Sequence, residues 1–293
     1  MDIQQVGIIG GGTIGRNIAR AIAGKGIGVI LCDLNEHMCK NISQKLDREL
    51  EYEITRWSIT PGELKAIKSR IEFTWDKTKL KKMPIIIECI QDSEVDRKID
   101  LFNELNKICE PNSIFISNTA VFSITEIAGK SHRPDKIIGV HFLYPVHKIK
   151  TVEMVRGLTT TPDTYERVRN FLGQIGKRII ELHESPGYIS TRMLAVWMNE
   201  AFELLQNRVA GPEDIDHVVR QIFCSKYGPF QLADRLGLDT IQLWMRQLAK
   251  ELGNPKYSPS PALNRLVNAG FLGVKDGRGV YYYNDPTLKN AND

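Results

Sequence analysis

Short apolar runs alternate with segments of helical periodicity along the amino-terminal part of the chain. The runs are rich in isoleucine and valine and are bounded by glycine or polar residues, which is typical of strands buried in a parallel sheet. Between them, apolar residues recur every three to four positions and predict amphipathic helices. We therefore expect an α/β domain with a largely parallel sheet. The predicted strands are Val6–Ile9, Gly28–Cys32, Ile85–Ile87, Ile114–Ser117, Ile137–Phe142, Val152–Arg156 and Arg178–Leu182.

The pattern changes after Ser185-Pro186-Gly187, where helical periodicity replaces the strand-like runs. We predict an all-α second domain, with 1–184 forming the first domain and 185–293 the second. Within the second domain only Val280–Tyr283 is predicted to be extended. The predicted helices are Asn17–Ala23, Asn35–Arg70 (interrupted around Ser58–Gly62, with Thr60 as cap), Val95–Cys109 and Pro162–Gly176 in the first domain, and Ile189–Arg208, Pro212–Phe223, Phe230–Leu252 and Ser260–Ala269 in the second.

A glycine-rich turn joins the first predicted strand to the first helix. Its pattern is Gly10-x-Gly12-x-x-Gly15, with Thr13 and Ile14 inside the motif. The first glycine permits a tight turn, the second lets a pyrophosphate approach the backbone, and the third lets the helix pack closely on the sheet. The helix amino terminus then presents N–H groups and a positive dipole to the anion. Because strand, turn and helix occur together, the motif predicts a Rossmann-type dinucleotide site.

An acidic residue, Asp33, closes the second predicted strand. A carboxylate there accepts hydrogen bonds from the adenosine ribose hydroxyls and repels a 2′-phosphate. Neither Leu34 nor Asn35 beside it supplies a positive charge that could bind such a phosphate. The sequence therefore predicts NAD as the cofactor in preference to NADP.

Composition narrows the class of protein further. With 42% apolar and 25% charged residues, the 293-residue chain has enough apolar material for two globular cores. Its net charge of +4 comes from scattered basic residues, which argues against nucleic acid as a partner. No apolar stretch is long enough to span a membrane, and no secretory signal is evident, so we expect a cytoplasmic protein. Five irregularly spaced cysteines without a Cys-x-x-Cys pair predict free thiols and no metal site.

Two residues near the end of the α/β domain are candidates for catalysis. His141 lies at the end of the predicted strand Ile137–Phe142, and Glu153 follows in the next one. Ligands of open α/β sheets bind at the carboxyl ends of strands, which suits His141. A glutamate in an apolar strand is costly to bury without a partner, so the two side chains could satisfy each other. Taken singly, each residue is as compatible with a structural role.

Longer motifs extend over nearly the whole chain and resemble those of 3-hydroxyacyl-CoA dehydrogenases. They comprise the segment from Ser117-Asn118-Thr119 to Glu153, Ser185–Tyr188, Gly228–Asp234 with Gly237–Asp239, and Leu272–Gly279. The resemblance implies a Rossmann-type domain followed by a helical domain. It also implies a homodimer joined through the helical domains.

The resemblance assigns roles to matching residues. His141 would be the general base that takes the proton of the substrate hydroxyl while hydride passes to the nicotinamide, and Glu153 would orient its imidazole. Asn118 and Lys275 match positions near the nicotinamide half of the cofactor. A further cofactor contact of the family matches either Arg97 or Lys98. The segment between Glu88 and Phe102 differs from the family pattern by one residue in length, so the sequence does not decide between the two.

Three substrate-side positions depart from the family pattern. Where the family usually has a serine that hydrogen-bonds the reacting oxygen, this chain has Ala120. Where the family has an asparagine near the same oxygen, this chain has Thr191. The asparagine of the family pattern His-Phe-x-Asn-Pro is replaced by Tyr144. An oxyanion donor can contribute about 2.7–4 kcal/mol to a transition state, and alanine supplies none. We interpret the changes as altered substrate preference, because the base, the orienting acid and the cofactor loop all remain. Drift toward a weak or lost activity is the alternative.

Three functions therefore stay open. The first is NAD-dependent dehydrogenation of a 3-hydroxyacyl-CoA thioester. The second is the same chemistry on an acyl-carrier-protein thioester, such as a glyceryl unit, or on a small hydroxy acid. Lys65, Lys68 and Arg70 could meet CoA phosphates or an acidic carrier protein, or form a solvated surface. The third is a non-catalytic NAD-binding protein, which the presence of His141 and Glu153 argues against.

Overall fold

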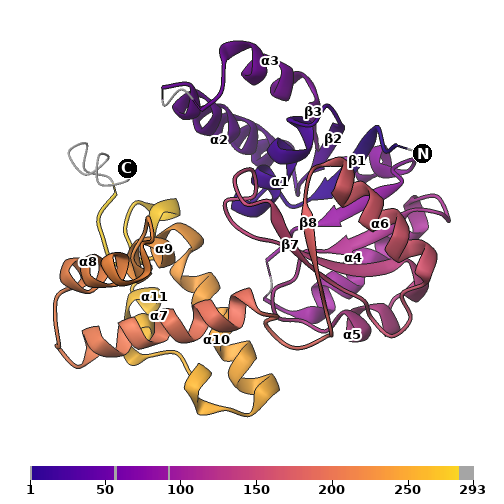
Figure 1. The fold of residues 1–293 in the computed structure, drawn as a ribbon. Helices are drawn as coiled ribbons and strands as arrows, with labels where there is room; N and C mark the ends of the chain where they lie inside the picture. The colour runs from indigo at the N-terminus through magenta and orange to yellow at the C-terminus, as the bar shows by residue number, and fades with distance from the viewer. Residues whose placement is uncertain (1, 56–57, 92, 284–293) are drawn as a thin grey trace. The chain divides into compact units, whose positions relative to one another are not determined.

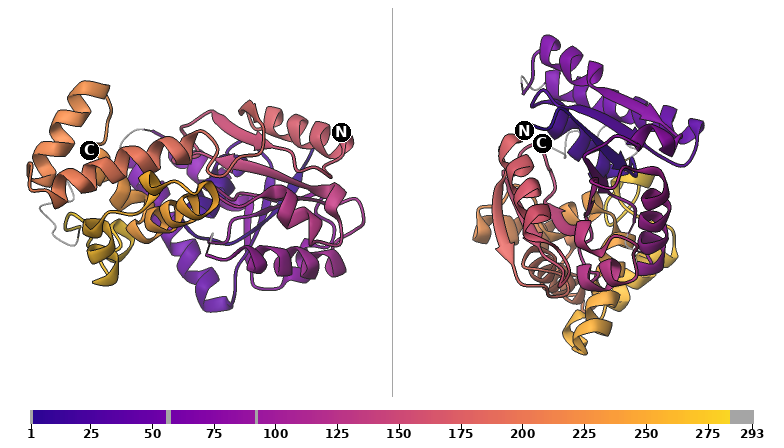
Figure 2. Two further views of the ribbon diagram at one scale, coloured as in Figure 1. Left: turned by 90° about the horizontal axis from the view of Figure 1, so that it is seen from below. Right: turned by 90° about the vertical axis from the view of Figure 1, so that its right-hand side faces the viewer.

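A computed structural model describes residues 2–55, 58–91 and 93–283 of the chain. The chain divides into two compact units, Met1–Ser185 and Pro186–Asp293, and each is described by itself. Figures 1 and 2 show the first unit as a sheet with flanking helices and the second as a set of helices coloured salmon to yellow. The predicted fold class, a Rossmann-type α/β unit with a mostly parallel sheet followed by a helical unit, is confirmed.

The first unit contains one eight-stranded sheet in the order β3-β2-β1-β4-β5-β6-β7-β8. Every neighbouring pair is parallel except β6 and β7, which are antiparallel. The strands are β1 Gln5–Ile9, β2 Gly28–Cys32, β3 Ile71–Thr74, β4 Ile85–Glu88, β5 Ile114–Ser117, β6 Ile137–Phe142, β7 Thr151–Val155 and β8 Arg178–Leu182. The helices are α1 Thr13–Ala23, α2 Glu36–Thr55, α3 Pro61–Ser69, α4 Val95–Ile108, α5 Ile124–Gly129 and α6 Pro162–Gln174, with 3₁₀ turns at Lys77–Leu80 and Pro134–Lys136.

The two faces of the sheet carry different helices. Val6, Ile87, Ile116 and Val140 lie on one face and pack with apolar residues of α1, α2 and α6 in a continuous core. Side chains alternate between the two faces along each strand, so the residues next to these four in their strands point to the opposite face. On that second face, Phe102 of α4 stacks on Phe115 of β5 with ring centroids 5.6 Å apart. Alternation from Phe115 and Val140 places Ser117 and His141 on this α4 face, together with Glu88.

Some elements of the first unit were not predicted. β3 is a four-residue edge strand in which only two residues are buried, so its apolar pattern is too weak to be recognised. α5 has only six residues, fewer than two turns of apolar repeat. The predicted break between α2 and α3 is confirmed at its carboxyl side. There Thr60 caps α3 by accepting the backbone N–H of Glu63, whose side chain accepts the N–H of Thr60 in return.

The second unit is helical throughout its regular structure. Its helices are α7 Ser190–Gln206, α8 Pro212–Phe223, α9 Pro229–Leu236, α10 Leu238–Leu252 and α11 Pro261–Asn268, with 3₁₀ turns at Pro255–Tyr257 and Val274–Asp276. The prediction of one helix over Phe230–Leu252 is wrong. Gly237 has a φ of 101° and separates α9 from α10, because such a backbone angle cannot continue a helix.

The segment predicted to be extended at Val280–Tyr283 forms no regular strand, and its Tyr282 makes one isolated bridge, to Arg278. A buried carboxylate takes the place of a partner strand. Asp234 of α9 accepts the backbone N–H groups of Val280 and Tyr281 and the Tyr283 hydroxyl at 2.8–3.0 Å. Over the described ranges of both units, no helix combines the length and hydropathy needed to cross a bilayer.

Candidate active site

The glycine turn after β1 has the geometry of a dinucleotide cradle. Gly10 has a φ of 97°, and a side chain there would meet the Cys89 carbonyl at 2.8 Å. A Cβ on Gly15 would lie 1.9 Å from the Gly10 carbonyl oxygen, whereas the space around Gly12 is open. Thr13 and Ile14 begin α1 in half-buried positions, and no side chain caps this helix. An uncapped helix amino terminus beside an open glycine backbone fits a pyrophosphate.

Asp33 lies beside this cradle at the end of β2. Its carboxylate accepts the backbone N–H of Gly11 at 2.6 Å through Oδ2 and that of Leu34 at 2.7 Å through Oδ1. The acid is thereby tied to the glycine turn itself. A fixed negative charge at this point fits ribose hydroxyls and disfavours a ribose phosphate.

His141 and Glu153 are brought together by the only antiparallel pairing in the described sheet. The two residues are directly opposite in the register of β6 and β7. The Nδ1 atom of His141 lies 2.9 Å from Oε2 of Glu153, and the residues are 8% and 3% exposed. With the carboxylate on Nδ1, the imidazole is held in one orientation with that nitrogen carrying the proton. This is the arrangement of a histidine base with its orienting acid.

Asn118 and Ala120 follow the end of β5, next to the histidine strand. The Asn118 side-chain oxygen accepts the backbone N–H of Phe142 at 2.9 Å, so the amide braces the residue after His141. Ala120 is buried in a turn that is stabilised by the Thr119 hydroxyl, which accepts the backbone N–H groups of Val121 and Phe122. Tyr144 is half-buried in the connection after β6. Compared with the family pattern, Ala120 therefore removes a hydroxyl from the turn after β5, the strand that pairs with β6.

Two predicted site residues belong to the helical unit. Thr191 lies in the first turn of α7, fully buried, and its hydroxyl makes no hydrogen bond to the described part of the chain. Lys275 lies in the Val274–Asp276 turn, where its ammonium contacts both carboxylate oxygens of Asp239 at 2.6 and 2.7 Å. Their assignment to the substrate and the cofactor stays a prediction.

The two alternatives for a further cofactor contact have different surroundings. Arg97 is exposed on α4 and donates to the Ser93 hydroxyl at 3.2 Å. Lys98 is fully buried, and its ammonium lies 2.6 Å from the Glu88 carboxylate. Glu88 also accepts the hydroxyl of Ser117 at 2.7 Å. Neither Glu88 nor Ser117 was a predicted functional residue, although a charged side chain closing the run Ile85-Ile86-Ile87 was a visible signal.

The basic residues of the α2–α3 hairpin have partners within the chain. Lys68 forms an ion pair with Asp47 at 2.8 Å, and Arg70 donates to the Ala23 carbonyl at 3.2 Å. Lys65 is exposed on α3. The surface interpretation of Lys68 and Arg70 is therefore supported by contacts that need no ligand.

A second histidine, His147, lies in the connection after β6, and its contacts are with α1 and α2. His147 lies 3.2 Å from the Asn17 side chain and 3.4 Å from Glu53. Burial, together with the nearby Arg20, lowers the pKa of His147 to about 4. It is therefore neutral near pH 7 and is a poor candidate for proton transfer.

Comparisons with known proteins agree with this geometry. Residues 5–185 match the model of the 3-hydroxyacyl-CoA dehydrogenase NAD-binding domain, and residues 187–283 match the carboxyl-terminal domain of the same family. The chain belongs to the 3-hydroxyacyl-CoA dehydrogenase family, and so to the NAD-dependent oxidoreductases that act on CH–OH groups. The predicted family and the predicted cofactor are confirmed.

Individual relatives are similar over nearly the whole chain. A probable 3-hydroxybutyryl-CoA dehydrogenase of Bacillus subtilis is 36% identical, covering 98% of this chain and 100% of that protein. The crystal structure of (S)-3-hydroxybutyryl-CoA dehydrogenase PaaH1 from Ralstonia eutropha is 35% identical with a TM-score of 0.81, covering 97% and 100% of the two chains. That of FadB2 from Mycobacterium tuberculosis is 29% identical with a TM-score of 0.88 and the same coverage.

The position of His147 predicts an acid-sensitive fold. The unfolded chain takes up a proton on this histidine near pH 6.5, whereas the folded chain does so only near pH 4. The free energy of unfolding should therefore fall as the pH is lowered, by about 1–2 kcal/mol between pH 7 and pH 5. Urea unfolding of the wild type and His147→Asn at several pH values measures this, and the variant should show the shallower dependence. His37→Asn, at an exposed position on α2, is the matched control; an equal effect of both variants would contradict the assignment.

Proposed function

We propose that this protein is an NAD-dependent dehydrogenase that interconverts a 3-hydroxyacyl-CoA thioester and its 3-ketoacyl form. The observation that carries the proposal is the buried His141–Glu153 pair, on the same sheet as the glycine cradle. A base and a hydride acceptor are the two groups that oxidation of a secondary alcohol needs. Relatives named as 3-hydroxybutyryl-CoA dehydrogenases support the thioester as substrate.

In the proposed mechanism His141 moves the proton. Bound NAD would supply the hydride acceptor for the carbon that bears the hydroxyl. The Nε2 atom of His141 takes the hydroxyl proton, because Nδ1 faces Glu153. Glu153 stabilises the imidazolium that results and keeps the ring in place. In the reverse direction the imidazolium protonates the forming alkoxide.

The cofactor residues of the first unit would act together. Gly10, Gly12 and Gly15, with Thr13 and Ile14, would hold the pyrophosphate at the amino terminus of α1, and Asp33 would accept the adenosine ribose hydroxyls. Asn118 would sit near the nicotinamide, next to the base it braces. Lys275 remains proposed as a cofactor contact from the resemblance alone.

A second candidate substrate is a thioester carried on an acyl carrier protein, or a small hydroxy acid. It is favoured by Ala120, Thr191 and Tyr144, which replace polar groups that the family pattern places around the reacting oxygen. The Thr191 hydroxyl is buried without a hydrogen bond in the described structure, so it can serve as a donor. A smaller or more polar acyl group would suit these changes.

The test of function is NADH formation at 340 nm with NAD and short 3-hydroxyacyl thioesters, each offered on CoA and on a carrier-protein pantetheine arm. We expect turnover on the CoA substrates. Turnover confined to the carrier-bound substrates would establish the second candidate instead. NAD binding without turnover on any thioester or small hydroxy acid would contradict both and favour a non-catalytic NAD-binding protein.

Replacing the proposed base separates chemistry from cofactor binding. His141→Gln should lower kcat by about 10²- to 10⁴-fold, because no group then takes the hydroxyl proton. NAD affinity, measured by calorimetric titration, should stay at the wild-type value. His132→Gln, on an exposed turn of the same unit, serves as the control with normal turnover. If NAD binding falls in parallel with kcat in His141→Gln, the role assigned to His141 is wrong.

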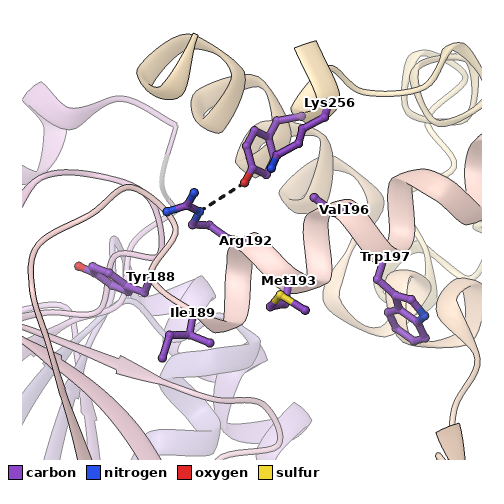
Figure 3. Close-up of a pocket in the computed structure, with 8 residues that line it drawn as sticks. Tyr188, Ile189, Arg192, Met193, Val196, Trp197 and Lys256 are labelled. Carbon is purple, nitrogen blue, oxygen red and sulfur yellow. Dashed lines mark hydrogen bonds between the residues drawn. The ribbon is translucent and has the colours of Figure 1, made fainter. Parts of the chain in front are cut away.

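We further propose that a second copy of the chain covers an apolar surface of the helical unit. Ile189, directly before α7, is followed at intervals of four residues by Met193 and Trp197 on the helix, and Figure 3 shows the three side chains on the same side of α7. Met193 is 69% exposed, and Phe223 of α8, 63% exposed, contacts Trp197 edge to face at 6.4 Å. Ile189, Met193 and Trp197 also line a pocket of about 500 Å³, together with residues that include Arg192 and Lys256. Apolar side chains grouped in this way are typical of protein interfaces.

The oligomeric state tests this surface. We expect a dimer of the wild type by light scattering coupled to size exclusion, and a monomer for Met193→Asp/Phe223→Asp, because two carboxylates would be buried at the contact. Leu158→Asp, at an 89% exposed position in the first unit, should remain dimeric. A wild-type monomer, or a double variant that still dimerises, would rule the surface out.

A further inference from the structure

Arg16 directly follows the glycine motif and has no part in the proposed proton transfer. It lies in the first turn of α1 and is 7% exposed. Its Nε and Nη2 atoms both donate to Oε1 of Glu49 on α2, at 3.1 and 2.7 Å. Its Nη1 atom donates to the carbonyl oxygen of Gly11 at 3.0 Å. The guanidinium therefore joins α2 to the backbone of the cofactor cradle.

The backbone of Gly11 is held from three directions. Its N–H donates to the Asp33 carboxylate at 2.6 Å, and its carbonyl accepts Nη1 of Arg16. On the side of α2, a Cβ at Gly11 would lie 2.3 Å from Cδ1 of Ile42, so that helix packs directly against the turn. The position between the first two glycines of the motif is thus fixed by residues from three different segments of the chain.

The contact with Arg16 also sets the direction of the next backbone N–H. The peptide bond between Gly11 and Gly12 is trans, and a planar trans peptide points its C=O and its N–H to opposite sides. Because the Gly11 carbonyl is turned to Arg16, the Gly12 N–H is directed away from it. The space around Gly12 is open, and no side chain caps α1. Backbone N–H groups at such a helix amino terminus are the groups that bind a pyrophosphate.

A second ion pair of the same kind joins α1 to α2 one turn further along. Nη2 of Arg20 lies 3.3 Å from Oε2 of Glu53. These two residues follow Arg16 and Glu49 by four positions each. Glu53 also lies 3.4 Å from His147, in the connection after β6. Replacing a buried ion pair by apolar residues is often neutral for stability, so the packing of the two helices is by itself a weak account of the Arg16 contact.

We propose that Arg16, anchored by Glu49, is a positioning residue for NAD. It fixes the Gly11–Gly12 peptide in the orientation that presents the Gly12 N–H to the pyrophosphate. Without this contact the peptide would have to be ordered when the cofactor binds, which costs affinity. The inference rests on the proposed assignment of the pyrophosphate to the glycine cradle, and it does not depend on which substrate is oxidised.

The test replaces the pair by apolar residues and compares ligands with and without phosphates. In Arg16→Met/Glu49→Leu the melting temperature should stay near the wild-type value, because both charges are removed together. NAD and ADP, titrated by calorimetry, should bind about 10-fold more weakly, since the hydrogen bond from a charged donor to the cradle is lost. Adenosine, which has no phosphate, should displace NADH with an unchanged inhibition constant when NADH fluorescence is followed.

The second ion pair supplies a matched control. Arg20→Met/Glu53→Leu makes the same changes between the same two helices, one helical turn away from the contact with Gly11. The control variant should keep the wild-type affinities for NAD, ADP and adenosine. A loss of ADP affinity that is confined to the Arg16/Glu49 variant is then due to the contact with the cradle.

The single variant Glu49→Leu tests whether Arg16 acts from its anchored position. It keeps the guanidinium but frees it from α2, and ADP should again bind more weakly than to the wild type. Unchanged or tighter ADP binding would mean that Arg16 acts on the phosphates directly, and the positioning role would be wrong.

The proposal is also overturned if the Arg16/Glu49 double variant keeps the wild-type ADP affinity, because the contact is then structural only. Equal losses in the control variant would assign the effect to helix packing. A parallel loss of adenosine affinity would assign it to a general disturbance of the unit. A wild-type protein that binds NAD without turnover on any substrate would refute the proposed function, and the ADP affinities would still decide the role of Arg16.

Discussion

The antiparallel register of β6 and β7 is the constraint on which the candidate site depends. In an otherwise parallel sheet, this pairing sets His141 directly across from Glu153, so the proposed base and its proposed orienting acid are both supplied by strands. A parallel partner would need a crossover of a dozen residues or more, and the connection between these strands is too short for one. The short return after Phe142 therefore decides the pairing, and the pairing decides the catalytic geometry.

The alternation of side chains along the strands places three buried polar residues on the same face of the sheet. Glu88, Ser117 and His141 occupy three strands, and each points to the side of the sheet that α4 covers. Their neighbours along the strands belong to the apolar core on the opposite face. Buried polar side chains on adjacent strands must satisfy one another, because burial without partners is costly. The hydrogen bonds from the Ser117 hydroxyl to Glu88 and from His141 to Glu153 meet that requirement.

Local patterns in the sequence were enough to predict the elements and the motif residues. Apolar runs identified seven of the strands, and the glycine motif with Asp33 identified the cofactor cradle, because both depend on residues close together in the chain. Ile71–Thr74 was missed because only two of its four residues are buried and the run is interrupted by the exposed Glu72. The break at Gly237 was missed because a single glycine within apolar periodicity does not reveal its φ angle. Val280–Tyr283 was misjudged because its partner is the distant carboxylate of Asp234.

The surroundings of the candidate site residues could not be predicted from the sequence, because they depend on contacts between residues far apart in the chain. Either Arg97 or Lys98 matches a family cofactor position by sequence, and the structure shows that their surroundings differ. Arg97 is exposed, whereas the Lys98 ammonium is buried against Glu88 and the Ile90 carbonyl. Which of the two contacts the cofactor stays a prediction. Ala120 is buried in a turn held by the Thr119 hydroxyl and carries no hydroxyl of its own, so under the proposed function it gives the substrate no hydrogen-bond donor. In the proposed mechanism, proton transfer needs only His141 and Glu153, whose side chains are paired. Stabilisation of the developing oxyanion needs an additional donor, and this division allows the acyl preference to change while the chemistry is kept.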